Sequence, residues 1–300
     1  MYNILNNSIS LKAAIGIFFL WLSASLPCSA QLDNTIFQDF TQTIVTPYLI
    51  NPSSTDTSYS FKIQGNSVDA IGLIKYVNRF YADADKRIKT SRSGSFHFVG
   101  IQATSSKIGQ YISRNRFQAR YSWYTQLTTK AALSAGISLG FINYAFLTTQ
   151  GGTGGSALGP DGTLGIHYVR QNTIIGFAIQ QIFPTVLIPI SQSFQLKKLY
   201  NIDISQRFRL GPWVSLKAYG VAQFSSQTKL LYNMGVMADI SQHIIAGANS
   251  FTSQKTSFNF GVKEIRIYGG ELMIMTTYSV YNKKLPGYNS TLELFIALQL

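Results

Sequence analysis

From about Tyr59 to Leu300 the sequence alternates, residue by residue, between apolar and polar or small side chains. In Leu133–Phe141, for example, leucine, isoleucine, alanine and phenylalanine interleave with serine and glycine. Side chains of a β-strand point to opposite faces with a period of two, so each such segment has one apolar and one polar face. A closed sheet of these segments can enclose a polar interior and expose its apolar face to lipid. The pattern is typical of an outer-membrane β-barrel.

Turn residues divide the alternating region into about fourteen strands, and an even number is the rule in single-chain bacterial barrels. We therefore predict an all-β fold, a transmembrane antiparallel β-barrel over residues 58–300. The first two strands are expected at Ser58–Gln64 and Val68–Phe80. No internal run of residues is apolar enough over about 18 residues to form a membrane helix.

Three longer segments between the strands are expected to be external loops, because barrels of this type keep their periplasmic turns short. They are Tyr81–Gly94, Gln150–Gly162 and Phe183–Ser193. The last segment is unusually apolar for a loop, so it could fold over the barrel mouth or contact a partner. The residues predicted to make that contact are Phe183, Val186, Leu187, Ile188 and Ile190.

The N-terminus has the features of a secretory signal peptide. Lys12 precedes a short apolar stretch, Ala13–Ala24, and small residues follow it. We place the cleavage after Ala30, so that residues 1–30 are removed. The mature chain then contains no cysteine, because Cys28 is the only one, and disulfides and thiol catalysis are excluded. Cys28 also raises the alternative of lipidation, which Pro27 directly before it fits poorly.

Residues 31–57 do not alternate cleanly, and they contain Pro47 and Asn51-Pro52. Proline cannot donate to a strand ladder, which argues against a central strand here. We expect a short N-terminal segment outside the barrel wall, lying either at the periplasmic rim or inside the lumen.

The chain is strongly basic, with 25 Lys and Arg against 12 Asp and Glu and a formal net charge of +13. In a soluble protein this balance would suggest nucleic acid. Here the basic residues are spread over strands and turns, and a signal peptide removes the chain from nucleic acid. Outer-membrane lipids, including lipopolysaccharide, or an acidic partner are better candidates. Equally, the charges could simply keep a lumen and its rim hydrated.

The polar face of one strand carries a column of arginines. Each would cost roughly 2–4 kcal/mol at the lipid midplane, so the column must face the lumen. The predicted lumenal basic residues are Arg114, Arg116, Arg120, Lys62 and Lys217. They could line an anion-selective pore or seat an acidic partner segment. Alternatively they are neutralised inside a filled barrel, and the acids expected to pair with them are Asp203, Asp239 and Glu271.

Catalytic residues are not indicated. The histidines His97, His167 and His243 fall on separate predicted strands without the spacing of metal ligands. Ser95 and His97 could be imagined as the couple of an outer-membrane lipase, but this spacing arises often in a serine-rich chain. We expect no enzyme, no metal and no cofactor.

The N-terminal segment resembles that of the PorP/SprF family of Bacteroidetes membrane proteins. The resemblance rests on Phe40-Thr41-Gln42 and on Pro47 to Asn51-Pro52. Thr46-Pro47 replaces the first Asn-Pro of the family, and Ser53 replaces the alanine that follows the second. The family's Arg-x-Gln-Trp strand is not clearly present. Further similar segments are Phe98–Ile101, Lys107–Gly109, Leu133–Gly140 and Glu293–Phe295.

The resemblance implies an outer-membrane component or partner of the type IX secretion system and gliding machinery. Some members are needed to secrete or attach one cognate adhesin through its C-terminal domain. The expected partners are therefore a secreted protein with a C-terminal sorting domain or other type IX components. The alternative is a diffusion channel or a transporter of hydrophobic solutes.

Overall fold

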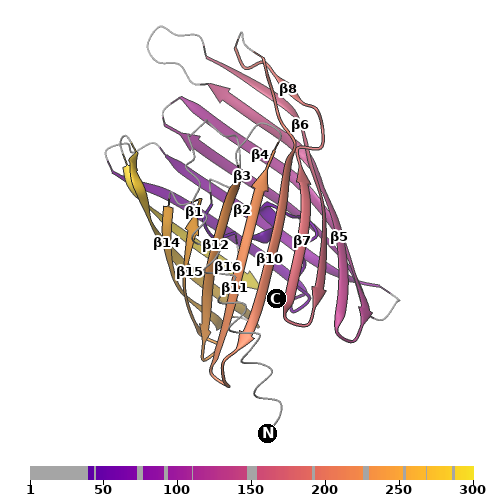
Figure 1. Cartoon of the computed structure of the whole chain (residues 1–300). Helices are drawn as coiled ribbons and strands as arrows, with labels where there is room; N and C mark the ends of the chain where they lie inside the picture. Colours follow the sequence, from indigo (N-terminus) through magenta and orange to yellow (C-terminus); the bar gives the residue numbers. More distant parts are fainter. Residues whose placement is uncertain are drawn as a thin grey trace. The chain divides into compact units, whose positions relative to one another are not determined.

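The computed structural model shows a closed antiparallel barrel in which fourteen strands surround the lumen (Figure 1). This confirms the predicted architecture and strand number. The predicted signal peptide and residues 31–39 lie outside the described residues. The structure describes residues 40–43, 45–72, 77–90, 94–109, 111–146, 154–190, 193–225, 230–252, 255–267, 269–285 and 288–300.

Each wall strand pairs with its neighbours in sequence, except that β7 pairs with β10, and β1 closes the barrel against β16. A separate two-stranded sheet, β8 (Val186–Leu187) and β9 (Phe194–Gln195), lies between β7 and β10 in the chain. The wall strands are β1 (Phe61–Gly72), β2 (Asn78–Lys89), β3 (Ser95–Ile108), β4 (Ile112–Thr128), β5 (Ala131–Phe146), β6 (Gly155–Arg170), β7 (Thr173–Gln180), β10 (Leu199–Arg209), β11 (Val214–Phe224), β12 (Leu231–Ile240), β13 (Ile244–Phe251), β14 (Lys255–Ile267), β15 (Gly270–Leu285) and β16 (Tyr288–Gln299).

The two ends of the barrel differ in the length of their connections. Short turns at residues 129–130, 171–172 and 241–243 lie at the end where β1 begins and β16 ends. The longer connections, among them residues 181–198, join strands at the opposite end. Because barrels of this type have short periplasmic turns, the short-turn end is periplasmic and the other is external.

The alternation separates the two faces of the wall as expected. In β4 the polar residues Gln118 and Ser122 are buried toward the lumen, whereas Phe117 and Tyr121, each directly before one of them, are exposed. Phe117 stacks on the outward-facing Phe141 of β5, with ring centroids 6.2 Å apart. Pairs of this kind across strands stabilise the lipid-facing surface.

Two predicted external loops are wrong. Most of Tyr81–Gly94 belongs to β2, which ends at the periplasmic side, and Gly155–Gly162 belongs to β6. Likewise β1 runs without a break through residues 65–67, where the first two strands were expected to separate. The acidic residues of this segment, Asp83 and Asp85, are buried on the lumenal face of β2. Residues 150–153 lie outside the described residues.

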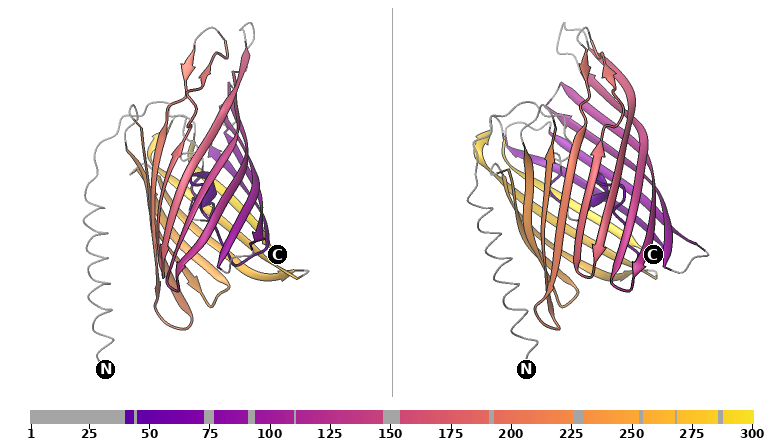
Figure 2. Two further views of the ribbon diagram at one scale, coloured as in Figure 1. Left: turned by 90° about the vertical axis from the view of Figure 1, so that its right-hand side faces the viewer. Right: turned by 45° about the vertical axis from the view of Figure 1, so that its right-hand side comes forward.

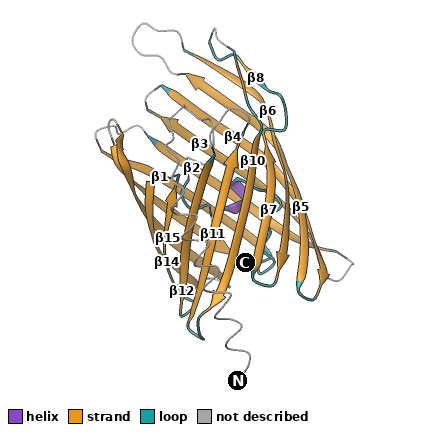
Figure 3. Ribbon diagram, in the orientation of Figure 1, coloured by secondary structure: helices purple, strands orange, loops and turns teal. Residues whose placement is uncertain are grey.

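The polypeptide also passes through the lumen. A 3-10 helix, η1 (Pro47–Leu49), lies inside the barrel in Figures 1 and 3, surrounded by the wall strands. Figure 2 shows the same segment from two further sides. Among the described residues, no helix is long and apolar enough to cross a membrane.

Candidate functional site

The described residues from Phe40 to Tyr59 form a plug inside the lumen. Pro47 occupies the start of η1, where its fixed φ favours a helical turn and its missing N–H is not needed. Tyr48, Leu49 and Ile50 are buried. Leu49 packs against apolar side chains of β1 and β2, and Ile50 packs against apolar side chains of β11, β12 and β13. The plug therefore contacts apolar side chains in two separate regions of the wall.

The N-terminal end of the plug is held by a buried carboxylate. The backbone N–H groups of Thr41 and Gln42 donate to the two oxygens of Glu293, at 3.0 and 3.3 Å. Asn66 of β1 donates its side-chain amide to the same carboxylate at 2.5 Å. Glu293 is 0% exposed, so these bonds replace the water that a carboxylate would otherwise require. We call Thr41, Gln42 and their wall partners the N-terminal clamp.

The same clamp includes a closed ring of neutral hydrogen bonds along the wall. Gln42 donates its side-chain amide to Thr277 at 2.7 Å, and Asn233 donates to the carbonyl of Thr41 at 3.2 Å. Side chains of β12 to β15 complete the ring between these two points. The connecting bonds run from Thr277 to Asn259 at 2.6 Å, from Asn259 to Asn249 at 3.0 Å and from Asn249 to Asn233 at 2.9 Å.

The C-terminal half of the plug contains a tight turn at Asn51-Pro52-Ser53. The Oδ1 atom of Asn51 accepts bonds from the N–H of Ser53 at 3.1 Å and from its hydroxyl at 2.6 Å. The Ser53 hydroxyl also lies 3.0 Å from Nδ1 of His167, whose Nε2 lies 2.6 Å from Asp203. A chain of hydrogen bonds thus ties the turn to β6 and β10. We call it the C-terminal clamp.

Two wall glycines make room for this turn. A Cβ atom on Gly136 would lie 2.5 Å from the backbone nitrogen of Ser53, and one on Gly165 would overlap the side chain of Asn51. Gly136 and Gly165 are direct partners of β5 and β6. Next to them, Ser134 donates to the carbonyl of Ser53 at 2.7 Å. The wall is therefore shaped to the backbone of the turn as well as bonded to it.

Between the two clamps, Tyr48 lies against a buried cation. The Arg120 guanidinium is 3.9 Å from the centre of the Tyr48 ring, within the range of a cation–π contact. The Tyr48 hydroxyl lies 2.7 Å from that of Tyr59, which donates to Asp85 at 2.9 Å. Burial raises the pKa of both plug tyrosines well above the usual value, so they remain neutral donors.

The predicted arginine column is buried on the lumenal side of β4, but its acidic partners are not those expected. Arg116 pairs with Asp161, and Arg120 lies 3.5 Å from Asp83 and 3.3 Å from Asp85. Arg120 and Asp85 reach each other over the intervening strand β3, where their common partner is Gly100. A Cβ on Gly100 would lie 2.8 Å from the Asp85 side chain, so glycine permits this ion pair.

The expected acids bind elsewhere. Asp203 bonds to His167, and Asp239 pairs with Lys263 at 2.6 Å. Glu271 faces Arg266 across the β14–β15 pair. Arg114 is buried in the lumen beside Arg116. Of the predicted lysines, Lys62 is buried, and its Nζ lies 5.5 Å from the ring centres of Tyr48 and Tyr59. Lys217 is half-buried on β11, opposite Arg207 of β10.

The plug residues that carry the family resemblance each contact the lumenal wall. Phe40 packs on Tyr81, and Gln42 and Asn51 bond to opposite regions of the wall. The similar segment at Glu293–Phe295 supplies the carboxylate that holds Thr41 and Gln42. The His167–Asp203 pair was missed, although both residues have the lumenal parity of their strands and could have been suspected from it.

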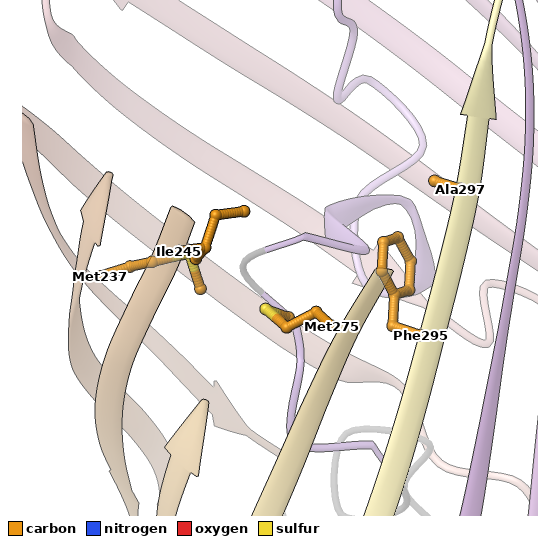
Figure 4. Packing of buried hydrophobic residues seen from close by; sticks show 5 residues of the cluster. All are labelled: Met237, Ile245, Met275, Phe295 and Ala297. Carbon is orange, nitrogen blue, oxygen red and sulfur yellow. The ribbon is translucent and has the colours of Figure 1, made fainter. Parts of the chain in front are cut away.

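A patch of apolar side chains interrupts the polar lumen (Figure 4), on the periplasmic side of the N-terminal clamp. Two methionines, an isoleucine, a phenylalanine and an alanine from β12, β13, β15 and β16 form it, and Val45 of the plug packs against them. The plug therefore seats on the wall by burial of apolar area as well as by polar bonds. The five residues are Met237, Ile245, Met275, Phe295 and Ala297.

The predicted contact loop divides between two environments. Leu187 is buried against Ile142 and Tyr144 of β5, which corrects its expected place in an exposed surface. The other predicted contact residues are exposed at the external end. They are Phe183, Val186, Ile188 and Ile190.

The arrangement can hold a polypeptide, whereas features of catalysis are weak. Ser53, His167 and Asp203 resemble a hydrolase triad in composition, but the Ser53 hydroxyl is fully buried and donates to Asn51. His97 bonds to Tyr121, away from His167. Within the described ranges, no three side chains of the usual metal-ligating types are placed to hold a metal ion.

Comparisons with solved structures show the fold. The toluene transporter TbuX of Ralstonia pickettii is 14% identical, with a TM-score of 0.57 over 87% of this chain and 93% of that one. The toluene transporter TodX of Pseudomonas putida is 9% identical, with a TM-score of 0.52 over 83% and 92%. Omp33, an outer-membrane protein of Acinetobacter baumannii, is 10% identical, with a TM-score of 0.50 over 81% and 98%.

The family comparison is more specific than the fold. No curated protein matches the chain significantly. A family model described as the type IX secretion system membrane protein PorP/SprF matches residues 34–297, from before the plug almost to the end of β16. The chain is an outer-membrane β-barrel, and it belongs to the PorP/SprF family of type IX secretion system membrane proteins.

Proposed function

We propose that this barrel is a non-enzymatic accessory component of type IX secretion that holds a secreted cell-surface protein at the outer membrane. The plug carries the proposal. Its N-terminal clamp bonds to β12–β16 and its C-terminal clamp to β5, β6 and β10, so the same segment is fastened to opposite regions of the lumenal wall. A barrel filled in this way is better suited to binding a partner than to passing one.

The external hairpin is the surface that we assign to that partner. Val186, Ile188 and Ile190 are 56%, 59% and 47% exposed, whereas Leu187 between them anchors the hairpin to β5. A cluster of exposed apolar side chains on a fixed support is typical of a protein-binding surface. The partner would be a secreted protein with a C-terminal sorting domain.

Affinity purification of the tagged protein from native outer membranes tests this function. We expect a secreted surface protein or other type IX components to be recovered with the wild-type barrel. A variant with Val186→Ser, Ile188→Ser and Ile190→Ser should lose the secreted protein. The matched control replaces the exposed Leu127 and Leu210 of the periplasmic end by serine and should retain it. Recovery of no secretion partner by the wild-type protein would contradict the proposal.

A second function, diffusion of small apolar solutes, is favoured by two observations. The lumen contains the apolar patch of Met237, Met275 and Phe295, and the barrel shares its fold with toluene transporters. Planar-bilayer recordings and uptake of labelled toluene into liposomes separate the two functions. Solute uptake by the wild-type barrel with its plug in place would favour the channel. Uptake at the rate of protein-free liposomes would eliminate it.

A further inference from the structure

The lipid-facing surface near the periplasmic ends of β2, β3 and β4 carries polar side chains. Lys86 is exposed and belongs to the outward column of β2 that also contains Ile88. On β4, Tyr121 and Trp123 are 43% and 37% exposed, and His97 of β3 stands directly opposite Trp123. Directly opposed residues share a face of the sheet, so all four polar side chains lie on the outer face of the wall. We call Lys86, His97, Tyr121 and Trp123 the outer donor cluster.

The outer donor cluster lies at the level of the membrane interface. β2 ends at Lys89 and β3 begins at Ser95, so Lys86 and His97 are two or three residues from the periplasmic ends of their strands. At about 3.3 Å per residue, both are within about 10 Å of those ends. Tryptophan and tyrosine at this level are typical of the aromatic girdles of membrane barrels. A lysine here can extend its ammonium group to the interface while its stem covers apolar surface.

The cluster surrounds a short stretch of one strand, β3. Val99 of β3 has Lys86 as its partner on β2 and Tyr121 as its partner on β4. The rings of His97 and Tyr121 stack with their centroids 5.7 Å apart, and Nδ1 of His97 lies 2.6 Å from the Tyr121 hydroxyl. The two rings therefore hold each other in place on one side of β3, and Lys86 stands on the other side.

Polar atoms of the cluster have no partner among the described residues. They are Nζ of Lys86, Nε2 of His97 and Nε1 of Trp123. Nε2 of His97 is a donor when the Tyr121 hydroxyl donates to Nδ1, so all three can donate. The exposed acid of β1, Asp69, lies toward the external end of its strand. A donor without an acceptor at the edge of the lipid loses a hydrogen bond, so this surface favours a ligand rich in acceptor oxygens.

Another part of the wall presents a different surface at the same level. In β12, β13 and β16 the outward residues Ile240, Ile244 and Ile296 near the periplasmic ends are exposed and aliphatic. Such residues need only the hydrocarbon of the bilayer. The donors are therefore distributed unevenly around the barrel.

We propose that the outer donor cluster binds the phosphate group of a phospholipid in the periplasmic leaflet. The phosphate lies over β3, between Lys86 and the stacked rings of His97 and Tyr121. The acyl chains of the lipid extend along the exposed Val99 and Ile101 toward the centre of the bilayer. An ammonium group forms charge-assisted hydrogen bonds with phosphate oxygens, and a cation near the surface strengthens attachment to anionic lipid. The site is independent of the role in secretion.

Lipid retention measured by native mass spectrometry tests the proposal. The full protein, refolded in detergent, is mixed with equal amounts of phosphatidylglycerol and a diacylglycerol that has the same acyl chains but no phosphate. We expect the wild type to retain phosphatidylglycerol about tenfold better, and Lys86→Gln/His97→Phe/Trp123→Phe to lose this preference. The matched control, Lys107→Gln/His243→Phe/Trp213→Phe, makes the same three changes at other positions and should keep the preference.

Three results would overturn the proposal. The first is a wild type without preference for the phosphate-bearing lipid, and the second is an equal preference in the cluster variant and the control. The third is displacement of phosphatidylglycerol by an excess of inorganic phosphate, which would make the cluster a site for the free anion. Heat-modifiable migration in gels confirms that each variant is folded. If the triple variant fails to fold, the single change Lys86→Gln at an exposed side chain takes its place and should still lower the preference.

Discussion

Thr41 and Gln42 meet a wall of amides and hydroxyls arranged around one carboxylate, whereas Tyr48 and Ser53 meet a wall of ion pairs and glycines. On the first wall the bonds are numerous and mostly neutral, and they form a ring through β12 to β15. On the second, Arg120 and His167 connect buried acids to the plug. Both walls face the same lumen, but they hold the plug through different chemistry.

The difference determines how each wall should respond to change. A neutral hydrogen bond contributes about 1 kcal/mol net, so the loss of one bond of the ring should weaken the binding of the plug to the wall only slightly. A buried ion that loses its partner retains its full desolvation penalty. Removal of a single group should therefore cost much stability in the wall of ion pairs and little in the wall of amides. The changes below test this contrast, beginning with the largest expected effect.

Replacing Arg120 by methionine should be the most damaging single change. It leaves Asp83 and Asp85 buried without their cation and removes the contact with the Tyr48 ring. We expect the free energy of unfolding to fall by about 3–5 kcal/mol. Urea unfolding of the barrel in lipid vesicles, followed by tryptophan fluorescence, measures this loss.

A compensating variant isolates the electrostatic cause. Arg120→Met combined with Asp83→Asn and Asp85→Asn removes all three charges, and it should recover much of the stability. If the triple variant were no more stable than Arg120→Met, the effect would come from lost packing rather than from unpaired buried charge.

Glu293→Gln should release the N-terminal clamp while the barrel stays folded. The amide keeps the shape of the side chain but replaces one accepting oxygen by a donor that faces the N–H groups of Thr41 and Gln42. We expect a loss of about 2–3 kcal/mol in plug seating. The predicted mature chain contains no cysteine, so Val45→Cys provides a single reporter, and its maleimide labelling should become at least tenfold faster.

The matched control for this change is Glu271→Gln, because Glu271 is exposed at the rim, where its strand partners are Arg266 and Gln299. Its labelling rate at the Val45→Cys reporter should equal that of the reporter alone. Equal acceleration in both variants would mean that Glu293 does not hold the plug.

Much of the architecture can be predicted from the sequence because alternation is a local property. It assigns Arg116 and Arg120 to the lumenal face from their strand parity alone. Their partners could not be assigned, because the register between strands decides which acid an arginine reaches. Asp85 meets Arg120 only because β2, β3 and β4 align both with Gly100. Parity also does not fix where a strand ends, so β2 continues through residues that were predicted to form a loop.

The plug illustrates the second limit of prediction. Phe40, Gln42 and Asn51 are recognised by resemblance to a family, yet their positions depend on wall residues more than a hundred positions away, such as Glu293 and His167. No local pattern contains that information. The absence of alternation and the prolines show only that the segment is not a wall strand.

Gly136→Ala should disturb the C-terminal clamp by shape alone. The added methyl group would lie 2.5 Å from the Ser53 nitrogen and 2.6 Å from Pro52, so the turn must move. Overpacking of this kind costs roughly 1–2 kcal/mol, and we expect up to about tenfold faster labelling of a reporter at Ser54→Cys. Gly220→Ala is the matched control, since its nearest neighbours would be flexible side chains at 3.6 and 3.7 Å.

Asn249→Ala should have the smallest effect, and it tests the gradual response of the amide wall. Asn249 links Asn233 and Asn259 in the ring but does not touch the plug itself. Its removal should cost about 1 kcal/mol in plug seating, a less than tenfold change at the Val45→Cys reporter. A loss as large as that of Glu293→Gln would contradict the contrast between the walls, because it would show that the ring acts as one cooperative unit. Additive small losses in Asn249→Ala/Asn259→Ala would support independent bonds.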